Sequence, residues 1–119
     1  MNSESSSSQA PYRTVASGGE TFDAQLRLFL VERRLRAISE RGLAMLQAAL
    51  VETSRRFAAR GEPVHYLGSI FVPREERLLS LFAGGSIELV RTANEASLAP
   101  FISIESAVHL PDPGELMAE

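Results

Sequence analysis

The chain of 119 residues contains no cysteine and only two histidines, His65 and His109. Without cysteine there is no disulfide, no thiolate nucleophile and no zinc site built on thiolates. Oxygen and nitrogen ligands from carboxylates and imidazoles remain available. The missing cysteine therefore excludes certain chemistries, and it leaves the redox compartment undetermined.

Long apolar runs are also missing. No window approaches the ~18 consecutive apolar residues of a membrane span, and the first 25 residues lack the ~7–15 apolar residues of a signal peptide. A net charge of −3 is mild. Nucleic acid and anionic membranes are not expected as partners, because both need a clustered positive face. We therefore expect a cytoplasmic protein.

The composition divides the chain into three parts. Residues 1–25 are rich in serine and polar residues and are predicted to be a flexible tail. Residues 26–110 carry the patterned apolar residues and are predicted to form one α+β domain, which is large enough to bury a core. Residues 111–119 form a second short polar tail.

The order of elements in residues 26–110 predicts a fold. Alternating residues predict a strand over 26–35, and an apolar stripe after Ser39, a typical N-cap, predicts a helix over 39–60. Strands over 64–72 and 77–83 flank a polar turn. Ser86 caps a second helix, and a last strand follows Pro100. This β-α-β-β-α-β order is typical of a ferredoxin-like sandwich, with a four-stranded antiparallel sheet and two helices on one face.

Strict alternation of side chains divides each strand into two faces. The set assigned to the helix-covered face is apolar: Phe29, Val31, Tyr66, Ile70, Val72, Leu79, Leu81, Ile102, Ile104 and Val108. The set assigned to the helix-free face is mixed: Leu28, Leu30, Glu32, Arg34, His65, Leu67, Ser69, Phe71, Leu78, Ser80, Phe82, Phe101, Ser103, Glu105, Ala107 and His109. A mixed face of this size predicts a partner, and sheet-on-sheet packing in a homodimer is the expected arrangement. The alternative is that the N-terminal tail covers the face.

The segment from FLVERRL through ESAVHLP resembles a family of small bacterial ferredoxin-like proteins of unknown function that has nickel-responsive members. The motif YLGSIFVPREERLLSLF and the turn Leu98-Ala99-Pro100-Phe101 carry the resemblance, which covers about 85 of the 119 residues. It implies a dimeric α/β barrel and, in the metal-binding members, nickel held by histidines.

Two positions differ from those members. Glu32-Arg33-Arg34 stands where they have adjacent histidines, and Ala83-Gly84-Gly85 replaces a Glu-Ala-Pro sequence. Arginine is permanently protonated and cannot bind a metal, so a nickel site here needs ligands from elsewhere. The expected cofactor is none, or a divalent metal with nickel as the candidate.

The candidate functional residues lie on the mixed face. Glu32, His65 and Glu105 are the candidates for acid/base catalysis, because apolar surroundings can poise such groups near neutral pH. For Glu32 and Glu105 the alternative is an exposed glutamate or an ion pair with Arg34. The arginines between residues 33 and 60 are interspersed with acids and are interpreted as a solvated flank. The candidate ligand-binding residues are Leu30, Arg34, Ser69, Phe71, Ser80, Phe82 and Ser103.

Three functions follow from this pattern. The first is a small-ligand or metal-responsive binding protein with its pocket on the helix-free sheet face at a dimer interface. The second is a cofactor-independent enzyme, an isomerase, cyclase or lyase, that moves a proton within an apolar cavity. The third is a dimerisation module without a pocket.

Overall fold

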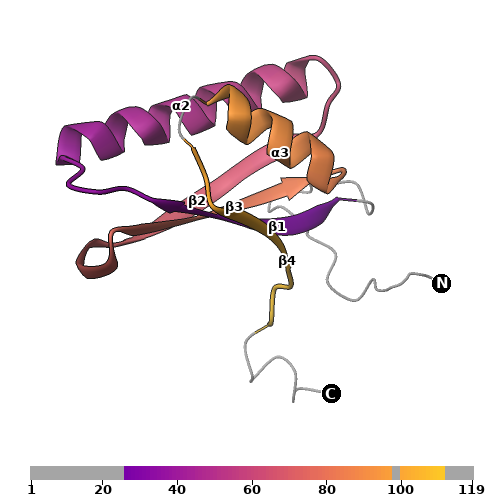
Figure 1. Cartoon of the computed structure of the whole chain (residues 1–119). Helices are drawn as coiled ribbons and strands as arrows, with labels where there is room; N and C mark the ends of the chain where they lie inside the picture. Colours follow the sequence, from indigo (N-terminus) through magenta and orange to yellow (C-terminus); the bar gives the residue numbers. More distant parts are fainter. Residues whose placement is uncertain (1–25, 98–99, 112–119) are drawn as a thin grey trace. The chain divides into compact units, whose positions relative to one another are not determined.

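The computed structural model describes residues 26–97 and 100–111 (Figure 1). The predicted tails, residues 1–25 and 111–119, lie outside this range except for Pro111. The segment Leu26–Ala107 forms one compact unit. No helix of the described residues is long and apolar enough to span a membrane.

Four strands form one sheet in the order β2-β3-β1-β4, and every neighbouring pair is antiparallel. The strands are β1 (Arg27–Arg34), β2 (Val64–Val72), β3 (Arg77–Gly84) and β4 (Ser103–Ala107). The helices α2 (Glu40–Ala59) and α3 (Ile87–Ala96) cover one face of the sheet (Figure 1). The prediction of a ferredoxin-like α+β fold is confirmed.

Both helices begin at the predicted caps. The Ser39 hydroxyl accepts a hydrogen bond from the Gly42 N–H at 2.9 Å, and the Ser86 hydroxyl accepts one from the Leu89 N–H at 3.2 Å. Each bond satisfies an N–H that the first helical turn leaves without a partner. After α2, Gly61 adopts φ 82°, a left-handed conformation that glycine enters without steric cost.

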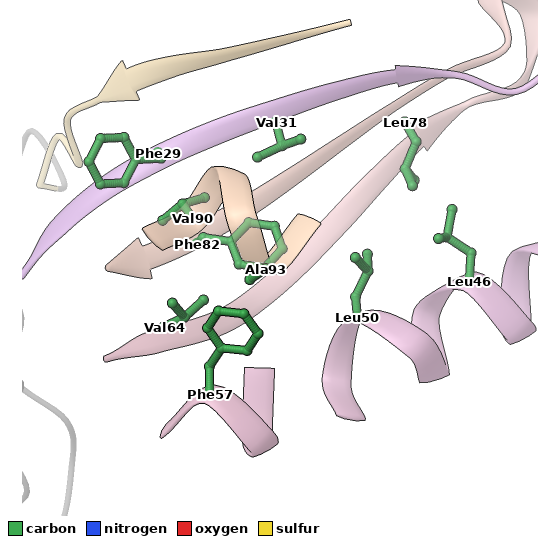
Figure 2. Packing of buried hydrophobic residues seen from close by; sticks show 10 residues of the cluster. All are labelled: Phe29, Val31, Leu46, Leu50, Phe57, Val64, Leu78, Phe82, Val90 and Ala93. Carbon is green, nitrogen blue, oxygen red and sulfur yellow. The ribbon is translucent and has the colours of Figure 1, made fainter. Parts of the chain in front are cut away.

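The core lies between the helices and the sheet (Figure 2). From α2 it takes the apolar stripe Leu46, Leu50 and Phe57, and from α3 it takes Val90 and Ala93. The sheet contributes Phe29, Val31, Val64, Leu78 and Phe82. Full burial of a leucine, valine or phenylalanine side chain stabilises the fold by roughly 1.5–3 kcal/mol, so this layer supplies much of the driving force for folding.

A β-bulge in β2 corrects one part of the face assignment. Tyr66 lies opposite Phe82 and Gly68 lies opposite Leu81, so Leu67 is the additional residue, and Gly68 adopts φ 135°. An inserted residue reverses the alternation of every side chain after it. The residues after the bulge therefore exchange faces relative to the prediction. Ser69 and Phe71 lie on the helix side, and Ile70 and Val72 lie on the helix-free side.

The assignment of β3 is also corrected. Ser80 lies opposite Val31 and Phe82 lies opposite Phe29, and directly opposed residues of antiparallel strands share a face. Ser80, Phe82 and the residues at every second position from them therefore face the helices. Leu81 and the residues at every second position from it face away from the helices. Both faces of this strand carry apolar residues, so the sequence pattern alone could not show which face is buried. Ile102, predicted to be covered, is 58 % exposed.

Candidate functional site

The helix-free face is the side of the sheet opposite α2 and α3. The register places fourteen side chains on it: Leu28, Leu30, Glu32, Arg34, His65, Ile70, Val72, Arg77, Leu79, Leu81, Ala83, Ser103, Glu105 and Ala107. Its centre is aliphatic, with Leu30 of β1 directly opposite Leu81 of β3. Ile70, near one edge, is 67 % exposed. An aliphatic surface of this extent is typical of an interaction site.

One ion pair crosses this face. Arg77 Nε donates to Glu32 Oε2 at 2.9 Å, and a second nitrogen of the same guanidinium lies 2.8 Å from Glu75 Oε1. The hydrogen bonds that Arg77 donates to Glu75 and to Glu32, in that order of importance, raise the pKa of Arg77 above its ordinary value. Glu32 is therefore ion-paired, but with Arg77 of the neighbouring strand and not with Arg34, the partner that the sequence suggested.

The structure brings part of the predicted site together. Glu105 lies opposite Leu30, and Ser103 lies opposite Glu32, so these residues of β1 and β4 are neighbours on one face. His65 is on β2, three strand spacings from β4, which corresponds to about 14 Å. The three candidate acid/base residues therefore do not form one cluster within a single chain.

The described residues do not fit a metal ion. Within residues 26–97 and 100–111 no group of three or more His, Asp or Glu side chains is placed to hold one. Arg33 and Arg34 cannot substitute as ligands, because guanidinium has no free electron pair to donate.

The four remaining ligand-binding candidates, Ser69, Phe71, Ser80 and Phe82, lie on the helix side. Here the Tyr66 hydroxyl donates to Gln47 Oε1 at 2.7 Å. Since a tyrosine has one donor, Ser69 donates to Tyr66 at 2.5 Å, and Ser80 donates to Ser69 at 2.7 Å. The two serine hydroxyls are thus hydrogen-bonded beneath α2. This series of hydrogen bonds links the sheet to that helix.

Arg33 is the functional candidate that sequence reasoning missed. It was assigned to a solvated flank, yet its side chain is fully buried. One guanidinium nitrogen donates to Asn94 Oδ1 at 2.9 Å, and the guanidinium carbon lies 5.9 Å from the centre of the Phe101 ring. Phe101 packs against the core, although it was expected on the helix-free face. The position of Arg33 in the strand could have predicted its burial. It is two residues from Val31 and four from Phe29, so all three side chains lie on the same face of β1.

Burial lowers the pKa of Arg33 to about 10, and the electrostatic interaction with Tyr66 opposes that shift. Arg33 therefore carries its charge at neutral pH inside the sheet–helix layer. Asn94, in turn, donates to the Val90 carbonyl oxygen at 2.8 Å, which fixes the amide and directs its oxygen at the guanidinium. Arg33 and Asn94 thereby join β1 to α3 through a buried charge-assisted hydrogen bond.

A shallow groove of about 290 Å³ lies between α2 and β2. It is lined by Val51, Ser54, Arg55, Ala58, Val64, His65 and Tyr66. His65 therefore lines the rim between the helix layer and the helix-free face. The Ser54 hydroxyl is buried and makes no hydrogen bond in the described structure.

Comparison with known proteins supports the fold. No family model matches the chain, and no curated protein matches it either. The crystal structure of SCO4226 from Streptomyces coelicolor A3(2) is similar, with a TM-score of 0.61 and 19 % sequence identity. The match covers 71 % of this chain and 99 % of that one. At this identity the likeness extends to the α+β fold alone.

The buried Arg33 makes the stability sensitive to Asn94. We expect Asn94→Ala to lower the free energy of unfolding by about 2–4 kcal/mol, because the guanidinium stays buried after losing its acceptor. The better helix propensity of alanine offsets only about 0.5 kcal/mol. Urea unfolding followed by circular dichroism measures the change. The control is Thr92→Ala on the exposed side of α3, which should change stability by less than about 0.5 kcal/mol; equal effects of the two variants would contradict the role given to Asn94.

Proposed function

We propose that the protein is a homodimeric small-ligand-binding protein, in which two copies pack their helix-free faces together and hold the ligand between them. The observation that supports this is the aliphatic centre of that face, which α2 and α3 do not cover and which the Glu32–Arg77 ion pair borders at one end of the strands. Contact with a second sheet would remove this surface from water. A two-fold arrangement needs only one self-complementary face.

The size of the face suits such an interface. Three strands of roughly 27 Å and β4 of about 17 Å, spaced about 4.8 Å apart, give a flat area of about 470 Å². Protruding side chains make the accessible area larger than the flat one. Stable interfaces bury about 800 Å² per partner. Face-to-face sheets pack about 10 Å apart, which leaves a thin layer of side chains in which a small ligand can be enclosed.

The chemistry of the face indicates a ligand class. Leu30, Leu79 and Leu81 offer an apolar wall, and Glu105 and Ser103 add acceptor oxygens on the side of β4. The Glu105 carboxylate forms no ion pair or hydrogen bond in the described structure, whereas the Glu32 carboxylate is bound to Arg77. A small, mostly apolar molecule with a cationic or hydrogen-bond-donating group facing Glu105 fits this arrangement.

The dimer is tested by Leu30→Arg. A charge placed at the centre of an apolar interface without a partner costs several kcal/mol, so we expect the dimer dissociation constant to rise about 100-fold or more. Sedimentation equilibrium measures the constant, and far-UV circular dichroism checks that the chain still folds. Met45→Arg on the exposed side of α2 is the matched control and should leave the constant unchanged. If the parent protein sediments as a monomer at 100 µM or more, the dimer proposal is wrong.

The ligand site is tested by Glu105→Gln with benzylamine as the probe, titrated by calorimetry. Loss of the carboxylate should weaken benzylamine binding about tenfold, because an ionic hydrogen bond in a dry site becomes a neutral one. Glu95→Gln, an exposed glutamate of α3, is the control and should have no effect. If the parent dimerises but binds neither benzylamine nor any other small apolar amine or alcohol, the protein is a dimerisation module instead.

A further inference from the structure

The connection from β1 to α2 is fastened to the turn between β2 and β3. The Leu35 N–H donates to the Glu76 carbonyl oxygen at 2.8 Å, and the Ala37 N–H donates to Glu76 Oε2 at 3.0 Å. Ala37 and Glu76 both adopt left-handed backbone conformations, with φ 50° and 55°. Such conformations cost roughly 1–3 kcal/mol each in residues other than glycine. Figure 1 shows the β1–α2 connection and the β2–β3 turn at the same end of the unit, and the hydrogen bond between Ala37 and Glu76 joins them.

Four exposed arginines gather on these segments. Arg34 ends β1, Arg36 lies in the connection, Arg41 is in the first turn of α2 and Arg74 is in the β2–β3 turn. We call this set the arginine end. None of the four makes an ion pair or a side-chain hydrogen bond in the described structure.

Arginines elsewhere on the surface of the unit are mostly neutralised. Arg55 and Arg56 pair with Glu52, and Arg60 pairs with Glu62. Arg27 and Arg91 are the other exposed arginines without an ion pair, and they lie at the start of β1 and within α3. Unpaired guanidinium groups are therefore concentrated at the arginine end.

The carboxylates at this end already have other partners. Arg34 lies directly opposite Arg77. Glu32 and Glu75 already bind Arg77, and the Glu76 carboxylate accepts the Ala37 N–H. Glu40 in the first turn of α2 is the one further carboxylate on these segments. In the described structure none of these carboxylates forms an ion pair with Arg34, Arg36, Arg41 or Arg74.

From this convergence we propose that the arginine end binds a phosphate-bearing small molecule. Guanidinium groups offer forked pairs of N–H donors that match phosphate oxygens, and several of them can bind one multiply charged group. The N-terminus of the 20-residue helix α2 points its partial positive charge to the same place. The proposal goes beyond the dimeric ligand site, because Arg36, Arg41 and Arg74 are not among the side chains that the register places on the helix-free face.

The test is calorimetric titration of the full-length protein with sodium pyrophosphate. At about 20 mM ionic strength, where the screening length is about 20 Å, we expect saturable binding of one pyrophosphate per chain. Arg36→Gln and Arg74→Gln should each weaken it about fivefold or more, because each removes charge-assisted hydrogen bonds. Arg91→Gln makes the same charge change on an exposed, unpaired arginine outside the set, and should change affinity less than about twofold.

Three results would overturn the proposal. The first is no binding at millimolar pyrophosphate. The second is an equal loss of affinity in Arg91→Gln, which would mean that overall charge alone attracts the anion. The third is equal or tighter binding of citrate or of a 20-nucleotide single-stranded DNA, since the site would then not select small phosphate compounds. Circular dichroism of each variant confirms that the fold is retained.

Discussion

The register of the central strand β1 is the constraint on which the rest of the structure depends. This strand pairs with β3 on one side and β4 on the other, so its alternation is transmitted across the sheet. Phe29, Val31 and Arg33 face the helices, and Leu30 and Glu32 face away from them. A slip of one residue would exchange the two sets, burying the Glu32 carboxylate and exposing the phenylalanine. The strong preference of each set for its own surroundings fixes one register.

Local signals in the sequence were sufficient for the elements and the fold. Ser39 and Ser86 cap their helices through their own neighbours, and the polar residues after Val72 form the turn where expected. The faces predicted for Phe29 and Val31 of β1 and for Ile104 of β4 also agree with the register. Glu32, Ser103 and Glu105 accordingly share the helix-free face, as the alternation indicated.

The errors arise where local pattern does not determine the face. In β2 the bulge at Leu67 and Gly68 inserts a residue, and a glycine between two apolar residues does not reveal it in advance. In β3 both parities are apolar, so only pairing with β1 assigns Ser80 to the helix side. Arg33 was missed because a charged residue is rarely buried without a partner. Its hydrogen-bond acceptor, Asn94, is 61 residues away and cannot be found by local reasoning.

The two faces of the sheet consequently have opposite chemistry. The helix side combines an apolar core with hydrogen-bonded polar side chains that include the buried charge of Arg33, and both join the sheet to α2 and α3. The other side is aliphatic around the Glu32–Arg77 pair. On the proposed account the first side specifies the fold, and the second carries the association and the ligand.

The central claim, that two copies meet through the helix-free face, is tested most directly by the distance between spin labels in the assembled protein. Because the chain has no cysteine, one introduced thiol labels each copy at a single site. Pulsed electron paramagnetic resonance on Ser103→Cys should give a distance of about 25 Å or less, since the sheets would lie about 10 Å apart. A label at Met45→Cys on α2 should give more than about 35 Å, because a helix layer separates it from each sheet. A shorter distance from the Met45 label, or no dipolar coupling from either label at 100 µM protein, would contradict the account.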